Sequence, residues 1–272
     1  MRRFYRLNLQ EMVDLYIEEG LTRILAEARV CQDIVLKAIA SGSLNRNVTI
    51  KGGVVMRSIT NNNRRATRDI DLDFIHYSLA DESIEAFIRR LNCIEGISIE
   101  ISGDIKELKH QDYHGKSIEV TIRDEFDYHV ESKIDIGVHK DLTIEQEEYC
   151  FDVCLDDNGA SLLKNTVEQA FTEKLRSLLI FANNSRRYKD IFDMYYLKDV
   201  VDVEKTNRLV KHYIYDDEGM KEKNIDDIIK RVSYAFKDSQ YLRRVSTSRQ
   251  RWVDDDIKAI ADGIIEFLEK LS

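Results

Sequence analysis

The chain has 272 residues, 43% of them hydrophobic, and a formal net charge of -9. This length allows one large domain or two modest ones, and the negative charge excludes a protein that is basic over its whole surface, so any nucleic-acid contact needs a local basic patch. No stretch approaches the roughly 20 apolar residues of a membrane span, and residues 1–11 lack the apolar core of a signal peptide, so we expect a cytoplasmic protein with no membrane partner.

The first half of the chain is predicted to contain both helices and strands. Apolar residues recur every three or four positions from Leu9 to Ser41, as in amphipathic helices. The β-branched run Val48–Ile50 predicts a short strand, which leads through a glycine pair into a helix over Val54–Thr60. In Asp69–Phe74, acidic and apolar residues alternate, which is typical of a half-buried strand. We expect a further helix at 81–91 and strands at 97–101, 117–122 and 131–138.

The second half is predicted to be helical. From about Leu162 the apolar residues follow a helical period almost to Ser272. We therefore predict an α+β domain over residues 1–155, with a mixed β-sheet and flanking helices, and a C-terminal helical domain over residues 156–272. The four cysteines show neither a disulfide framework nor metal-binding spacing, and we expect reduced, mostly buried thiols at Cys31, Cys93, Cys150 and Cys154.

Two aspartates on one predicted strand are the strongest candidates for chemistry. Asp69 and Asp71 are two residues apart, so both carboxylates project from the same face of the strand. One or two carboxylates, completed by waters and substrate phosphates, are what Mg²⁺ prefers. Asp135, between two isoleucines on another predicted strand, is the candidate third acid for the metal or for the attacking hydroxyl. Each acid alone is equally consistent with a solvated strand face.

A glycine turn precedes the acidic strand. Lys51-Gly52-Gly53 directly follows the β-branched run and opens a helix, which places backbone N–H groups and a helix N-terminus where a phosphate can approach. A lone glycine pair is equally typical of an ordinary strand-to-helix turn. Its position sixteen residues before Asp69 favours the phosphate interpretation, because the helix and loop can bring triphosphate and metal together.

Two basic segments are candidates for nucleic-acid contact. Arg64, Arg65 and Arg68 flank the acidic strand, and we expect them to contact nucleotide phosphates or an RNA end. The alternative for Arg65 is an ion pair with Asp71 or Asp73. The second segment, 241–252, interleaves arginines with Tyr241 and Trp252, as RNA-binding segments often do. A solvated helix end with the tryptophan in the core explains that pattern equally well.

Three blocks of sequence resemble a known family. Lys51–Met56 resembles the Gly-Gly motif, and Arg65–Leu72 the Arg-x-Ser/Thr-x-Asp-Ile-Asp-Leu motif, of the AbiEii abortive-infection toxins and the related MenT-type toxins, nucleotidyltransferases of the DNA polymerase β-like superfamily. Glu173–Leu175 and Arg187–Leu197 resemble the family's lysine-containing helix and its Arg-x-Arg/Lys-Asp-x-Tyr/Phe-Asp segment. The chain departs from the superfamily in lacking a serine after Gly52. An additional acid, Asp73, is expected to pair with an arginine.

The resemblance implies a site that draws on both predicted domains. Asp69, Asp71 and Asp135 would bind Mg²⁺ or Mn²⁺ and, with Lys174, carry the reaction. The remaining nucleotide-binding positions would be Lys51, Gly52, Gly53, Arg65, Lys189, Asp190 and Asp193. Without the resemblance, Lys189 with Asp193 and Arg186 with Asp190 read as helix-surface ion pairs, each contributing about 0.3–0.5 kcal/mol.

The expected function is metal-dependent transfer of an NMP from an NTP to an RNA acceptor. The family suggests the 3′ end of tRNA as the acceptor and a growth-inhibiting toxin with a cognate antitoxin. A catalytically silent nucleotide- or RNA-binding regulatory module and a metal-dependent nuclease are the alternatives. Intact Asp69, Asp71 and Lys174 favour the enzyme over the silent module.

Overall fold

The computed structural model describes residues 8–108, 115–139 and 141–271. The chain divides into two compact units, Met1–Asn165 and Thr166–Ser272. This boundary falls after Asn165 instead of after residue 155, because the last strand of the sheet runs from Ala160 to Asn165. The two units are described separately below.

The first unit is built on an eight-stranded mixed sheet. Its strands follow the order β3-β5-β6-β2-β1-β8-β7, and β4 pairs with β5 beside β3. The α+β class expected from the sequence is confirmed. The elements are α1 (Leu9–Glu18), α2 (Arg23–Ser41), β1 (Val48–Lys51), α3 (Gly52–Thr60), β2 (Ile70–Phe74), α4 (Asp81–Arg90), β3 (Ile97–Ile101), β4 (Lys106–Glu107), β5 (Lys116–Asp124), β6 (His129–Val138), β7 (Gln146–Phe151) and β8 (Ala160–Asn165).

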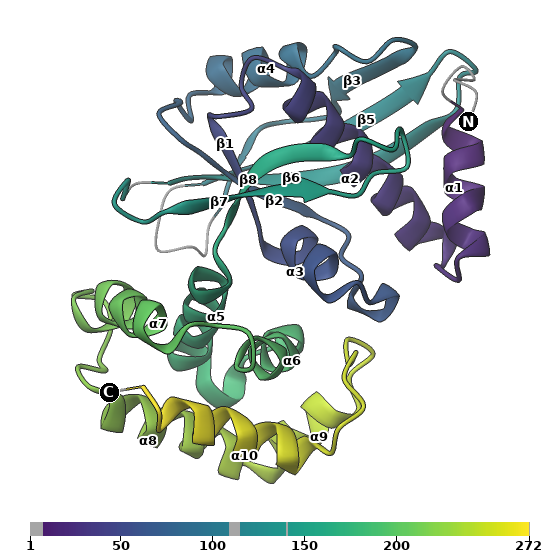
Figure 1. The fold of residues 1–272 in the computed structure, drawn as a ribbon. Helices are drawn as coiled ribbons and strands as arrows, with labels where there is room; N and C mark the ends of the chain where they lie inside the picture. Colours follow the sequence, from purple (N-terminus) through teal and green to yellow (C-terminus); the bar gives the residue numbers. More distant parts are fainter. Residues whose placement is uncertain (1–7, 109–114, 140, 272) are drawn as a thin grey trace. The chain divides into compact units, whose positions relative to one another are not determined.

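Strand pairing in the centre of the sheet determines which side chains meet. β1 runs antiparallel to β2, with Lys51 opposite Asp71, and β2 runs parallel to β6, with Asp71 beside Asp135. All four residues of β1 are buried, as expected for a central strand rich in β-branched residues. Figure 1 shows α2 running along the sheet, where it packs on β6 and β8, and α3 following directly from β1.

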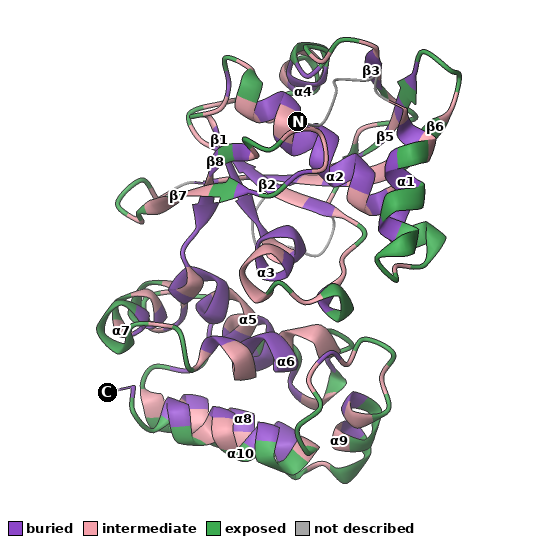
Figure 2. Cartoon of the chain, turned by 45° about the vertical axis from the view of Figure 1, so that its right-hand side comes forward, coloured by how far each residue is buried: buried purple, intermediate pink, exposed green. Residues whose placement is uncertain are grey.

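The core of the first unit lies between the sheet and these helices. Figure 2 shows buried residues concentrated on α2 and the central strands. Phe74 of β2 packs edge-on against Phe87 of α4, with 5.1 Å between ring centroids. Other fully buried members are Ile34, Leu36, Ile50, Leu72, Val120 and Ile134.

The second unit is helical, as predicted. Phe171 of α5 and Phe267 of α10 pack edge-on, with ring centroids 5.1 Å apart, and Phe192 of α6 is fully buried. No helix in the described part of the chain is long and apolar enough to cross a membrane. The elements are α5 (Val167–Phe181), α6 (Tyr188–Leu197), α7 (Val203–Val210), a π-helical turn (Lys211–Tyr215), α8 (Ile225–Lys237), α9 (Ser239–Ser246) and α10 (Ile257–Leu268).

The helical period predicted from Leu162 was wrong for its first residues. Residues 160–165 form β8, which pairs with both β1 and β7 and is therefore held by backbone hydrogen bonds on two sides. The helix begins at Val167, where the Thr166 side chain accepts a hydrogen bond from the backbone N–H of Gln169. The tertiary pairing of the strand outweighs the local helical pattern.

Candidate functional site

The three predicted acids gather at one end of β2 and β6. Asp71 and Asp135 are direct neighbours in the parallel pairing of these strands, so their side chains project from the same face of the sheet. Asp69 lies two residues before Asp71, immediately ahead of β2. We call Asp69, Asp71 and Asp135 the acidic cluster.

A lysine that sequence reasoning missed lies within the acidic cluster. The Lys133 ammonium is 2.9 Å from Oδ2 of Asp135 and 3.7 Å from Oδ2 of Asp69. Burial lowers the pKa of Lys133, but the hydrogen bond to Asp135 and the charges of the cluster outweigh it and raise the pKa. Lys133 therefore remains charged and partly neutralises the three acids. The available signal was its position two residues before Asp135, which places both side chains on the same face of β6.

The Asp71 carboxyl is desolvated by the residues around it. Burial raises the pKa of its carboxyl, and the charges of Asp135 and Asp69 act in the same direction. The charge of Lys51 and a hydrogen bond from the Gly53 backbone N–H oppose that rise without cancelling it. A cation that approaches this position would therefore stabilise the ionised form of the Asp71 carboxyl.

Two glycines make room for the site. Gly52 has φ +63°, and a Cβ added there would lie 2.2 Å from Oδ2 of Asp71. At Gly53 an added Cβ would lie 2.3 Å from the Thr67 hydroxyl oxygen. The serine expected from the superfamily pattern has no space at position 53, because Thr67 already places a hydroxyl against the start of α3.

Lys51, which was predicted to bind nucleotide, forms an ion pair inside the first unit. Its ammonium is buried and lies 2.6 Å from Oδ1 of Asp73, the residue that was expected to pair with an arginine. Gly137 makes this ion pair possible, since a Cβ there would lie 2.1 Å from the same Asp73 oxygen. Asp73 and Lys51 thus form a buried pair beneath the acidic cluster, and the prediction that Lys51 binds nucleotide remains untested.

The basic segment before β2 divides into buried and exposed parts. Arg65 is 3% exposed and ends a short 3₁₀ turn, whereas Arg64 and Arg68 are exposed. The backbone carbonyl of Arg68 accepts a hydrogen bond from the Ser132 hydroxyl at 3.3 Å, which links this segment to β6.

In the second unit, Lys174 is held by two carboxylates. Its ammonium lies 3.2 Å from Oδ1 of Asp190 and 2.9 Å from Oδ2 of the fully buried Asp193. The indole N–H of Trp252 donates to the other oxygen of Asp193 at 3.1 Å. Lys174, Asp190 and Asp193 are therefore in mutual contact, and Lys189 lies half-buried on the same helix as the two aspartates, α6; that they bind nucleotide stays a prediction.

The ion pair expected between Arg186 and Asp190 across one turn of α6 does not match the bounds of this helix. α6 begins at Tyr188, so Arg186 precedes the helix and cannot face Asp190 across one helical turn. Asp190 and Asp193 lie on the side of α6 that packs on α5, where Lys174 reaches both. These carboxylates are therefore internal to the second unit.

The second basic segment, 241–252, is built into the structure of its unit. Tyr241 is fully buried and Trp252 is 5% exposed. Arg251 donates to the backbone carbonyls of Ser246, Val253, Asp254 and Asp255. Arg244 donates to the backbone carbonyl of Asn183 at 3.0 Å. These contacts support the structural interpretation of the segment over RNA contact.

The acidic cluster fits a Mg²⁺-type ion that shares its coordination with substrate. Within residues 8–108, 115–139 and 141–271, no group of three or more His, Cys, Asp or Glu side chains is arranged to hold a metal ion. Mg²⁺ needs no such cage, because one or two carboxylates with waters and phosphate oxygens complete its octahedron. Oδ1 of Asp135 is buried and has no hydrogen-bond partner in the described structure. A cation between Asp71 and Asp135 would satisfy it.

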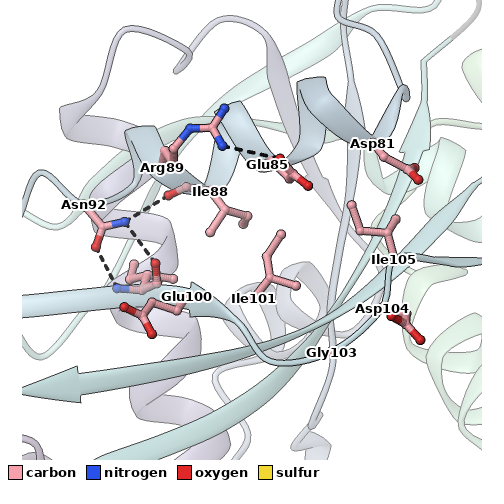
Figure 3. Close-up of a pocket in the computed structure, with 11 residues that line it drawn as sticks. Asp81, Glu85, Ile88, Arg89, Asn92, Glu100, Ile101, Gly103, Asp104 and Ile105 are labelled. Carbon is pink, nitrogen blue, oxygen red and sulfur yellow. Dashed lines mark hydrogen bonds and ion pairs between the residues drawn. The ribbon is translucent and has the colours of Figure 1, made fainter.

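A separate hollow of about 770 Å³ lies between α4 and β3 (Figure 3). Ile88, Ile101 and Ile105 form its apolar part, and Glu85 pairs with Arg89 at 3.5 Å along its edge. None of the predicted site residues lines this hollow. This hollow is therefore separate from the glycine turn and the acidic cluster.

The first unit is an α+β fold whose mixed sheet presents acids beside a glycine turn, the arrangement expected of a nucleotidyltransferase. A family model described as "Nucleotidyl transferase AbiEii toxin, Type IV TA system" matches residues 34–269. Because the match spans most of the chain, the protein belongs to the AbiEii nucleotidyl transferase toxin family. Its class is therefore that of a toxin–antitoxin nucleotidyltransferase, and membership implies an antitoxin partner.

The sequence matches no curated protein. Among solved structures, it is similar to an antigenic nucleotidyltransferase-like protein from Paracoccidioides brasiliensis, with 13% identity and a TM-score of 0.46 over 79% of this chain and 92% of that chain.

The cysteines differ partly from expectation. All four are free thiols, but Cys93 and Cys150 are exposed, Cys31 is buried and Cys154 is intermediate. The expectation of mostly buried thiols was therefore wrong for two of them.

Proposed function

We propose that the protein transfers an NMP from an NTP to an RNA acceptor in a reaction that depends on Mg²⁺ or Mn²⁺. The observation that carries this proposal is the parallel register of β2 and β6, which sets Asp71 beside Asp135, with Asp69 and Lys133 at the same end of the strands. We further propose the 3′ end of tRNA as the acceptor and the cytoplasm as the place of action; membership in a toxin family supports a growth-inhibiting activity.

Asp69, Asp71 and Asp135 are the residues that would hold the metal. When bound, the ion supplies Lewis-acid stabilisation of the charge that develops on the reacting phosphate. The pKa of Asp71, raised by burial and by the neighbouring carboxylates, supports this assignment, as does the buried Oδ1 of Asp135, which has no hydrogen-bond partner in the described structure.

The chain's own groups would then position the substrates. The backbone N–H groups at the start of α3 and the Thr67 hydroxyl would bind triphosphate oxygens at a helix N-terminus. Lys133, whose side chain is 39% exposed, would turn from the carboxylates towards the triphosphate when a cation replaces it. Asp135 would orient the acceptor hydroxyl or accept its proton.

The direct test is transfer of label. Purified protein is incubated with Mg²⁺, total tRNA and each NTP labelled at its α-phosphate, and the RNA is resolved on a denaturing gel. We expect labelled, extended RNA with one or more NTPs, and loss of label with Asp69→Asn, Asp71→Asn or EDTA. Asp104→Asn, an exposed acid in the same unit, is the matched control and should transfer normally.

The outcomes separate the alternatives. Shortened RNA without added label indicates a metal-dependent nuclease that uses the same acids. Nucleotide or RNA binding without any covalent change indicates a silent regulatory module. Transfer by Asp71→Asn at the wild-type rate contradicts the role given to the acidic cluster.

A further inference from the structure

A polar cavity of about 570 Å³ lies within the first unit, away from the hollow of Figure 3. Its walls come from α1, α2, the C-terminal half of α3, residues 61–67 and residues 149–157. The volume is within the range of small-ligand sites. The lining includes Arg57 and Gln32, two polar side chains that are more than nine-tenths buried.

Arg57 lies in the last turn of α3 and is 8% exposed. Its Nε, Nη1 and Nη2 atoms are all buried and have no hydrogen-bond partner among the described residues. An arginine cannot discharge by losing its proton, and an uncompensated buried charge costs several kcal/mol in general. Because buried polar groups are nearly always paired in native proteins, this guanidinium needs an explanation, and a bound anion is the simplest one.

Gln32 supplies the opposite kind of group. Its amide N–H donates to the backbone carbonyl of Thr67 at 3.0 Å, which fixes the orientation of the side chain. The amide oxygen, Oε1, is buried and has no partner in the described structure. Gln32 thus places an acceptor without a described partner in the cavity wall, and a ligand reaches it only when the side chains that cover Oε1 shift and when it brings an O–H or N–H donor.

The cavity adjoins the glycine turn. Thr67, which lines the cavity, packs against Gly53. Arg57 follows Gly53 by four residues on α3, so the two positions lie on one face of the helix, about one turn or 5.4 Å apart along its axis. A phosphate at Arg57 would therefore lie one helical turn from the proposed triphosphate turn.

The other charges in the cavity wall are already neutralised or lie at the surface. Arg29 pairs with the buried Asp33 at 3.1 Å, and Asp156 pairs with Lys37 at 2.6 Å. Glu19, Asp152 and Asp157 are exposed, where water and salt screen them. Arg57 thus provides the unneutralised charge of this wall within the described residues.

We propose that this cavity binds a nucleotide of the RNA acceptor strand, with its phosphate on Arg57 and its ribose 2′-hydroxyl or a base N–H on Oε1 of Gln32. This inference rests on the proposed function, since it places the acceptor beside the transfer site. An anion alone satisfies Arg57 but not Gln32, whereas a ribonucleotide satisfies both. The 2′-hydroxyl is the group by which a protein distinguishes RNA from DNA.

The test measures binding without catalysis. A fluorescein-labelled single-stranded RNA of mixed sequence, and DNA of the same sequence, are titrated with the full chain in EDTA without NTP, and anisotropy is recorded at several salt concentrations. Arg57→Gln should weaken RNA binding at least about tenfold, the loss typical of a charge-assisted hydrogen bond. The salt slope should fall by about 0.7 for one lost phosphate contact. Gln32→Met should reduce the preference for RNA over DNA.

Controls keep the result interpretable. Arg46→Gln removes an exposed arginine of the same unit that pairs with Glu148, and it should leave binding unchanged. Thermal melting checks the fold of each variant. If Arg57→Gln does not melt cooperatively, Arg57→Lys replaces it and should weaken binding several-fold, because a lysine cannot make a bidentate phosphate contact.

Three outcomes decide the proposal. Equal RNA affinity and salt slope for wild type and Arg57→Gln overturn it. Weakened binding of free NTP with unchanged RNA binding also overturns it and assigns the cavity to the nucleotide substrate. Arg57-dependent RNA binding supports the site even if no variant transfers label, so failure of the proposed reaction and failure of this site remain distinguishable.

Discussion

Replacing Gly52 by alanine tests the geometry of the glycine turn. Gly52 has φ +63°, a left-handed conformation that costs an L-residue roughly 1–2 kcal/mol. The new Cβ would lie 2.2 Å from Oδ2 and 2.8 Å from Cγ of Asp71. Because the Asp71 carboxylate is enclosed, relieving this overlap adds about 1–3 kcal/mol, the usual cost of overpacking. We expect Gly52→Ala to lower the free energy of unfolding by about 2–5 kcal/mol.

A matched glycine separates strain from collision. Gly20 also has a positive φ, +97°, but a Cβ there meets nothing within 4 Å. Gly20→Ala should therefore show the backbone cost alone. Both variants are compared by urea denaturation followed by circular dichroism, and by label transfer at a temperature where each is folded.

If Gly52→Ala is as stable as Gly20→Ala and transfers label at the wild-type rate, then Asp71 does not need its present position against the turn. Loss of transfer with stability equal to that of Gly20→Ala would show that the carboxylate moves away at no cost, which contradicts the enclosed site described here.

Three further predictions concern charge and burial. Burial raises the pKa of Asp71, so the contribution of this group to stability is present at low pH and is lost as the pH rises through its folded-state pKa. Asp71→Asn should therefore raise the free energy of unfolding at pH 7, in EDTA, by about 1 kcal/mol. In melting experiments, Mg²⁺ with NTP should stabilise the wild type but not this variant. Arg57→Met should raise both the melting temperature and the free energy of unfolding, the latter by about 1 kcal/mol, because it removes a buried charge that has no partner among the described residues. A lower melting temperature would contradict this description of Arg57. Iodoacetamide at pH 8 should modify the exposed Cys93 and Cys150 first. It should spare Cys31 and Cys154, because burial raises the pKa of both thiols, and mass spectrometry of the modified protein checks the order.

Local patterns predicted the centre of the first unit well. The alternation in Asp69–Phe74 and the β-branched run before Gly52 are both short-range signals, and the structure contains the strands they predict. The parallel neighbour of Asp71 is a long-range feature, yet Asp135 was identified because an acid between two isoleucines is unusual on a buried strand.

The features that sequence reasoning missed depend on distant segments. Lys133 occupies the acidic cluster only because β6 lies beside β2. Arg57 has the pattern of an ordinary helix residue, and its burial comes from helices and a loop that are remote in sequence. Lys51 was assigned to the nucleotide because it precedes the glycine pair, but strand pairing places Asp73 within its reach. Such contacts follow from tertiary packing, which no local period encodes.

The parallel pairing of β2 with β6 also has a consequence for synthesis of the protein. Asp69 and Asp71 leave the ribosome well before Asp135, and α4 and the strands β3 to β5 come between them. Because domains fold as units during synthesis and non-local strand pairing forms late, an emerging chain has no complete acidic cluster until β6 has been made and has joined the sheet. Under the proposed function, a nascent chain that ends before β6 therefore lacks the complete cluster that the transfer reaction needs.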